Sequence, residues 1–161
     1  MLFDLLSAEE EEADVRMGHL RFNIALLGGR LEGATRWIIE RGGRDLPRLG
    51  YFGSSTGAAA ALVAAAELGE AVGAIVSRGG RPDLAGPALG RVTAATLFLV
   101  GGEDESVISL NEEAYEKLRC TKLLRIIPGA THLFPEPGAL EQVALEASDW
   151  FRKHLGAGEQ R

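Results

Sequence analysis

Ser55 is the residue whose surroundings most favour nucleophilic chemistry. It stands at the centre of a Gly-Ser-Ser-Thr-Gly pentapeptide, residues 53–57. The apolar residues 49–52 before it predict a strand, and the alanine-rich residues 58–68 after it predict a helix. A serine on such a tight turn holds its hydroxyl above the sheet, and small neighbours let the chains approach closely. We therefore take Ser55 as the candidate nucleophile, and Ser54, beside the central position, as its alternative.

Two further loops carry groups that could activate a serine. Asp104 ends a Gly-Gly-Glu-Asp sequence after the apolar residues 96–100, and His132 ends a Pro-Gly-Ala-Thr-His sequence after residues 123–127. Loops beyond the carboxyl ends of parallel strands gather at one edge of the sheet. We therefore expect Ser55, Asp104 and His132 to form one site for acyl transfer.

Each of these groups has a chemical role in such a site. A serine hydroxyl is a weak nucleophile at neutral pH and needs a base within hydrogen-bond reach, which His132 could supply. Asp104 would orient the imidazole and stabilise its charged form. The backbone N–H of Thr56, at the start of the predicted helix, would donate to the oxyanion. The sequence pattern indicates no second oxyanion donor.

Each role also has a purely structural alternative. The pentapeptide around Ser55 could be only a tight turn, and His132 could be an ordinary loop histidine. Asp104 could cap the helix that follows it, with Glu103 or Glu105 in its place beside the histidine.

Two arginines follow the predicted strand at residues 72–77, on the same side of the sheet as Ser55. Arg78 and Arg81 could bind an anionic group of a substrate, and we select Arg78 as the candidate substrate-binding residue. A structural salt bridge is the alternative, and the sequence favours it.

Composition and charge argue against several other classes of protein. The chain has 161 residues and a formal net charge of -6, which argues against nucleic acid or an anionic membrane as a partner. Three scattered histidines, the single Cys120 and the lack of a nucleotide-binding glycine pattern predict neither a metal nor a cofactor. No basic segment precedes the first apolar residues, so we expect no signal peptide and a cytoplasmic location.

The order of predicted elements is that of an α/β fold. Apolar runs alternate with helical periodicities, which predicts about five parallel strands with helices on both faces, in one domain over residues 1–155. Residues 2–6 would form the first strand, residues 9–17 a loop or a frayed helix, and residues 156–161 a disordered tail. Residues 109–112, Ser-Leu-Asn-Glu, resemble a capping box near a helix start.

Four segments carry a family resemblance. They are residues 50–61 (GYFGSSTGAAAA), 77–85 (SRGGRPDLA), 99–104 (LVGGED) and 128–134 (PGATHLF). Together they resemble the α/β-hydrolase superfamily, nearest to its dienelactone hydrolase-like branch, over about residues 1–155. The resemblance implies a catalytic triad of Ser55, His132 and Asp104. Dienelactone hydrolase itself has cysteine as its nucleophile, so the serine implies a carboxylesterase-like enzyme that cleaves small carboxylic esters through an acyl-enzyme.

The resemblance also implies a difference at the start of the chain. Residues 2–6 resemble the strand that follows the second oxyanion loop of the family, so the earlier strands have no counterpart here. We hypothesise that residues 2–6 take the vacant position and pair with residues 49–52, which would bring residues 7–9 near the oxyanion. Alternatively, a second subunit covers the exposed sheet edge in a homo-oligomer such as a dimer. A further alternative is a catalytically silent module that binds a partner or needs another chain to complete its fold.

Overall fold

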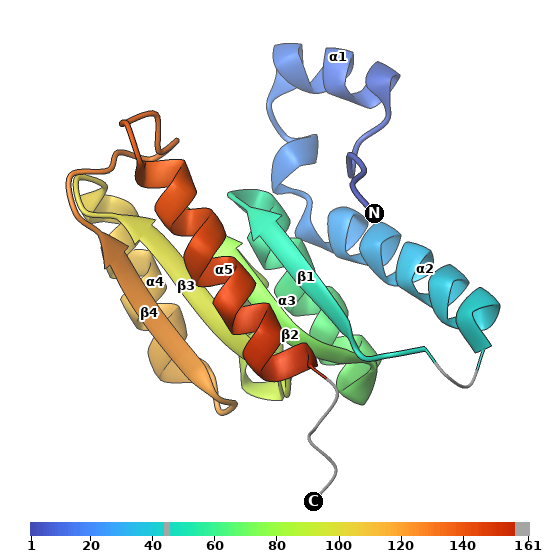
Figure 1. Ribbon diagram of the computed structural model, residues 1–161. Helices are drawn as coiled ribbons and strands as arrows, with labels where there is room; N and C mark the ends of the chain where they lie inside the picture. The colour runs from blue at the N-terminus through green and yellow to red at the C-terminus, as the bar shows by residue number, and fades with distance from the viewer. Residues whose placement is uncertain (44–45, 157–161) are drawn as a thin grey trace, which may run out of the picture.

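The computed structural model describes residues 1–43 and 46–156, which form a parallel sheet between helices (Figure 1). The strands are β1 (Leu49–Ser54), β2 (Val72–Arg78), β3 (Ala95–Gly101) and β4 (Lys122–Ile127), and they are neighbours in that order. All three pairings are parallel, so the four carboxyl ends lie along one edge. The predicted α/β class is confirmed, with four strands where about five were expected.

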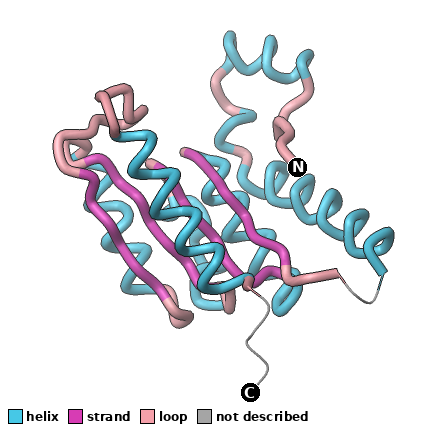
Figure 2. The backbone as a smooth tube through the Cα atoms, viewed as in Figure 1, coloured by secondary structure: helices cyan, strands magenta, loops and turns pink. Residues whose placement is uncertain are grey.

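Helices cover both faces of this sheet, as Figures 1 and 2 show. The helices of the described chain are α1 (Ala8–Met17), α2 (Ile24–Gly42), α3 (Thr56–Leu68), α4 (Glu105–Lys117) and α5 (Ala139–Leu155), with short 3-10 helices η1 (Leu20–Phe22), η3 (Gly69–Ala71) and η4 (Pro82–Arg91). Helix α5 lies on one face, α3 and α4 lie on the other, and α2 packs against α3.

Each face of the sheet has its own apolar core. The central strands β2 and β3 are buried along nearly their whole length, which explains why they are continuous apolar runs rather than alternating ones. Phe98 belongs to the core under α3, whereas its neighbour Leu99 belongs to the core under α5. Trp150 of α5 packs in that second core and donates its indole N–H to the carbonyl of Ala95 at 3.1 Å. Burial on both faces therefore fixes the strands that carry the candidate site.

Residues 2–6 form no strand, so the predicted pairing with residues 49–52 is wrong. In the part of the chain that the structure describes, β1 pairs with β2 alone, and its other edge is open. Leu5 and Leu6 instead pack against the core that α2 and α3 share, and Arg30 donates to the carbonyl of Leu5 at 2.8 Å. The apolar side chains are thus partly buried without any strand pairing.

Two helix starts differ from simple expectation. A capping box begins α1: the Ser7 N–H donates to Glu10 Oε2 at 2.9 Å, and the Glu10 N–H donates to Ser7 Oγ at 3.3 Å. Residues 9–17 are therefore helical. The capping box predicted at residues 109–112 is wrong, because α4 already begins at Glu105. The Ser109 hydroxyl donates back to the carbonyl of that residue at 3.3 Å, inside the helix.

Most of the tail predicted at residues 156–161 cannot be compared with the structure. Gly156 follows α5 as a bend, and residues 157–161 lie outside the described residues.

Candidate active site

Ser55 has a backbone conformation that residues with side chains rarely adopt. Its φ and ψ are 51° and -124°, and Gly69 and Gly86 have nearly the same pairs of angles, 53° and -126° and 50° and -125°. Those two positions carry glycine, which has no Cβ and adopts positive φ readily. A serine held in such a region costs about 1–3 kcal/mol. The strained serine at the junction of β1 and α3 therefore indicates a functional position.

Close packing and a backbone hydrogen bond hold this turn. A Cβ on Gly53 would lie 2.6 Å from the carbonyl oxygen of Gly57 and 2.7 Å from Cα of Ala58, so only glycine lets β1 approach α3 so closely. A Cβ on Gly57 would meet nothing within 4 Å, so the predicted need for a small residue holds at Gly53 alone. The Arg81 N–H donates to the carbonyl of Ser55 at 3.0 Å, which ties the loop after β2 to the turn.

The structure brings His132 and Asp104 together at the carboxyl edge of the sheet. Their Nδ1 and Oδ2 atoms are 2.6 Å apart, and the two side chains are 43% and 13% exposed. A Cβ on Gly101 would lie 2.4 Å from the carbonyl oxygen of Ala130, so the histidine loop reaches the end of β3 only because residue 101 is glycine. The aspartate thus hydrogen-bonds one nitrogen of an imidazole that stays partly exposed.

Asp104 is the carboxylate beside the histidine, whereas Glu103 and Glu105 are exposed. It is also the N-cap residue of α4, but its side chain makes no capping hydrogen bond. Asp104 therefore occupies the N-cap position with its backbone only, as the helix-cap alternative proposed, while the Asp104 carboxylate contacts His132.

Ser55 and His132 lie on loops that both contact the loop after β2, but within the described residues no hydrogen bond joins their side chains. The Ser55 N–H donates to the carbonyl of Arg78 at 3.4 Å. The next residue, Gly79, is close to the histidine, because a Cβ there would lie 3.7 Å from His132 Cε1.

Phe134 belongs to the site, although no sequence pattern marks it beyond its place two residues after His132. In the part of the chain that the structure describes, its φ of 58° is the other positive value at a non-glycine residue, and its ring is buried. The N–H of Phe134 donates to the carbonyl of Thr131 at 3.1 Å, which closes the turn that carries the histidine. The ring lies under the loop after β2, since a Cβ on Gly79 would be 3.4 Å from it.

A polar pair braces the same loop. Thr131 donates its hydroxyl to Glu136 Oε1 at 2.6 Å. This hydrogen bond holds the pKa of the Glu136 carboxyl below its ordinary value, because it favours the ionised form. The loop therefore keeps this contact at neutral pH.

The two candidate arginines have different partners. Arg81 forms an ion pair with Asp83 at 2.8 Å, so the salt-bridge alternative holds for Arg81. Arg78 donates from Nη2 to the hydroxyl of Ser54 at 2.7 Å. Its Nε is buried and has no hydrogen-bond partner in the described residues. Arg78 is thus a cation next to the candidate nucleophile that no carboxylate of residues 1–43 or 46–156 neutralises.

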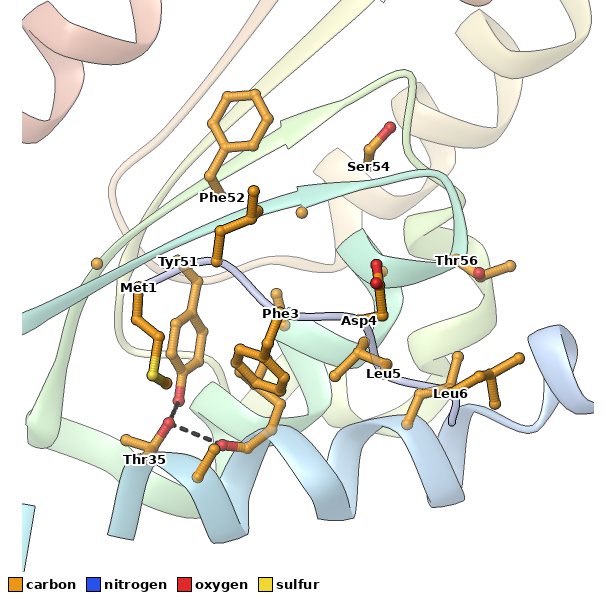
Figure 3. Close-up of a pocket in the computed structure, with 18 of the residues that line it drawn as sticks. Met1, Phe3, Asp4, Leu5, Leu6, Thr35, Tyr51, Phe52, Ser54 and Thr56 are labelled. Carbon is orange, nitrogen blue, oxygen red and sulfur yellow. Dashed lines mark hydrogen bonds between the residues drawn. The ribbon is translucent and has the colours of Figure 1, made fainter. Parts of the chain in front are cut away.

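A cavity of about 630 Å³ extends along the open edge of β1 (Figure 3). Residues 1–6 run beside β1 and form one wall, and apolar side chains of α2 form another. Inside it the hydroxyl of Tyr51 hydrogen-bonds to Thr35 at 2.6 Å, and burial raises the pKa of that tyrosine. At the end nearest the candidate site, the lining includes Ser54, Thr56 and Arg78. Its volume is in the usual range for small-molecule sites.

The other two histidines of the chain lie outside the candidate site. His19 precedes η1, and the His154 ring contacts the Trp150 ring in a tilted arrangement, with 4.2 Å between the ring centroids, near the end of α5. Among the described residues, no three His, Cys, Asp or Glu side chains are grouped closely enough to hold a metal ion. No helix in that part of the chain combines the length and apolar character needed to cross a membrane.

Comparisons with known proteins show the same fold. The crystal structure of dienelactone hydrolase from Anabaena variabilis is 58% identical, has a TM-score of 0.88, and is matched over 94% of this chain and 70% of that one. A dienelactone hydrolase-like promiscuous phosphotriesterase from metagenomic libraries shares the fold, with a TM-score of 0.69, 17% identity and the same coverage of 94% and 70%. No family model matches the chain.

Two curated relatives come from strains of Mycobacterium tuberculosis, and their names propose a phosphoribosyl transferase. Each is 52% identical over 155 residues, which are 96% of this chain but 34% of the relative. The chain therefore spans about a third of the length of these relatives.

A parallel sheet with a serine on a strained turn and an Asp–His pair on later loops defines the α/β-hydrolase class. With a 58% identical dienelactone hydrolase matched over most of both chains, this chain belongs to the dienelactone hydrolase-like family of α/β hydrolases.

Proposed function

We propose that this protein is a carboxylesterase-like serine hydrolase that cleaves small carboxylic esters, with Ser55, His132 and Asp104 as its triad. The strained backbone of Ser55 carries this proposal, since serine is retained where Gly69 and Gly86 show that glycine would be easier. The Asp104–His132 contact at the same edge of the sheet supports it. Membership in a hydrolase family supports the reaction class.

The reaction would proceed in two stages. His132 takes the proton of Ser55 Oγ as this oxygen attacks the ester carbonyl carbon, and the carbonyl oxygen becomes an oxyanion that accepts from the Thr56 N–H. The intermediate collapses, the alcohol leaves with the proton from His132, and an acyl-enzyme remains. Water, deprotonated by the same imidazole, then releases the acid and restores the serine. Asp104 stabilises the charged imidazole in both stages.

A fluorescent fluorophosphonate tests the proposal, because such probes label only activated serines. The wild-type chain and Ser54→Ala should be labelled, whereas Ser55→Ala and His132→Ala should not. Circular dichroism of each variant confirms folding. An unlabelled, folded wild-type chain would overturn the proposal, and loss of labelling in Ser54→Ala with retention in Ser55→Ala would move the nucleophile.

The transferase activity proposed in the names of the mycobacterial relatives is not carried over. The chain spans only 34% of each of those proteins. The contacts around Ser55 instead fit acyl transfer, with Arg78 as the proposed contact to the substrate. We also propose that the enzyme works in the cytoplasm without a cofactor, on a small ester rather than on nucleic acid or a membrane.

The open edge of β1 favours a second candidate function, a module that binds a partner through this edge. Unpaired strand edges invite pairing with another chain. Phe52 is 51% exposed on this strand. We propose a homodimer that covers the edge, and light scattering tests it. Phe52→Lys should then give a monomer, while Leu145→Lys, an exposed apolar position on α5, should not; a monomeric wild type would exclude the dimer.

A further inference from the structure

Arg78 is a cation in an unusual setting. It ends β2, where it pairs in register with Ser54, the residue directly before the candidate nucleophile. One Nη2 hydrogen bond reaches the Ser54 hydroxyl at 2.7 Å, and Nε is buried without a partner among residues 1–43 and 46–156. A guanidinium has five N–H donors and stays charged at any working pH. Several of these donors are therefore free beside the turn that carries Ser55.

The surroundings of Arg78 hold its guanidinium in place rather than neutralise it. The buried ring of Phe134 lies 5.8 Å from the guanidinium carbon, on the loop that carries His132. Several other arginines of the described chain have carboxylate partners, among them Arg81 with Asp83 and Arg91 with Glu67. A cation left unpaired in a partly buried position interacts more strongly with a nearby anion than it would in water.

The cavity relates Arg78 to the oxyanion position. Its lining includes Arg78, Ser54 and Thr56, whose backbone N–H is the proposed first donor. The oxygen of a tetrahedral intermediate needs donors that are already oriented when its charge develops, and loss of one donor typically costs about 10²–10³ in kcat. A guanidinium held by Ser54 and Phe134 at this end of the cavity is a candidate for such a donor.

We propose that Arg78 stabilises the oxyanion together with the Thr56 N–H, as a second donor in the reaction of Ser55. The assignment rests on the proposed hydrolase function. During attack, the carbonyl oxygen gains the negative charge and accepts a hydrogen bond from the guanidinium, which keeps all its protons. When the carbonyl reforms, this interaction weakens. Arg78 therefore lowers the barrier of both stages without taking part in proton transfer.

This role makes a different prediction from the binding of a fixed anionic group. An oxyanion forms from every ester, so loss of Arg78 should lower kcat for neutral and anionic substrates alike. A residue that only binds a carboxylate of the substrate would instead change KM, and only for substrates that carry one.

The experiment compares p-nitrophenyl acetate, a neutral ester, with mono-p-nitrophenyl succinate, an anionic one. Arg78→Met should lower kcat by about 10²–10³ on both with little change in KM, and guanidinium ion at millimolar concentration should restore part of the rate. Arg78→Lys should retain more activity than Arg78→Met. Arg91→Met, a surface control, should behave as wild type, and thermal melts should show that all variants fold.

Two results would overturn the assignment while leaving the hydrolase function intact. One is an Arg78→Met enzyme with unchanged kcat on both esters. The other is a variant whose only defect is a raised KM for the succinate ester. An inactive wild type would instead overturn the hydrolase function itself, and the assignment with it.

Discussion

The sheet region (residues 49–155) and the N-terminal region (residues 1–22, before α2) are built in different ways. In the first, apolar cores lie on both faces of the sheet, and every residue of β3 is buried. In the second, Leu2 is fully exposed, and α1 is held by ion pairs, with Arg30 bound to Glu10 and Arg21 to Asp14. The catalytic candidates all lie in the first region. The candidate residues therefore lie on the densely packed part of the molecule, which can hold their atoms in fixed positions.

The difference extends to the use of carboxylates. Asp104 in the sheet region orients an imidazole, whereas Asp14 in the N-terminal region accepts hydrogen bonds from Leu20 and Arg21. Burial raises the pKa of Asp14, but these hydrogen bonds outweigh it and hold the pKa below its ordinary value. One carboxylate would thus serve the reaction and the other the attachment of α1.

The largest expected effect separates these two carboxylates. Asp104→Asn should lower kcat for ester hydrolysis by about 10⁴, because the amide would favour the wrong imidazole tautomer. The melting temperature should change little. Asp14→Asn should show the reverse pattern, with near-normal kcat and faster hydrogen exchange in α1. Equal losses of activity in the two variants would contradict the division between the regions.

A pair of phenylalanines tests the packing side of the comparison. Phe98 of β3 is fully buried, whereas Phe52 of β1 is 51% exposed. Phe98→Ala should lower the free energy of unfolding by about 3–5 kcal/mol, the usual cost of emptying a core position. Phe52→Ala should cost less than about 1 kcal/mol, as for an exposed position. Urea denaturation measures both free energies of unfolding. If Phe52→Ala destabilised the protein more than Phe98→Ala does, the β1 edge would be covered in solution.

A substitution that releases the backbone strain at Ser55 should raise the free energy of unfolding. Ser55→Gly should abolish labelling by the fluorophosphonate yet raise the free energy of unfolding by about 1 kcal/mol, because glycine adopts this φ without penalty. Ser55→Ala should abolish labelling without this gain, since alanine keeps the Cβ. Equal stabilities for the glycine and alanine variants would argue against strain at the turn.

The sequence predicts the sheet region and its candidate site better than it predicts the N-terminal region. The three site loops followed from the sequence because parallel strands bring their carboxyl ends together whatever the details of packing. The contact of Asp104 with His132 needed only that general geometry. The state of Arg78 could not be predicted, since Arg78 and Arg81 look alike in sequence, and only the fold decides which one meets Asp83.

The N-terminal region was harder to predict, for a physical reason. An apolar run such as residues 2–6 can bury its side chains in a strand or against helices, and the pattern is the same in both cases. Here Leu5 and Leu6 pack against the helices. The positive φ of Phe134 was equally hidden, because a side chain that tolerates this conformation does so through its tertiary contacts.

The smallest expected effect is a local response to acid in the N-terminal region. The hydrogen bonds from Arg30 and Ser7 lower the pKa of Glu10 from 4.5 to about 2. Because the folded pKa is depressed, this contact stabilises α1 fully above pH 4.5, and the contribution is lost as the pH falls toward 2. Hydrogen exchange measured by NMR should therefore show α1 opening in this window before β3 does.

Glu10→Gln should open α1 already at neutral pH, and Glu32→Gln, which removes an exposed pair with Arg36, should not. If α1 and β3 instead lost protection together in wild type, the two regions would form one cooperative unit and the contrast drawn between them would fail.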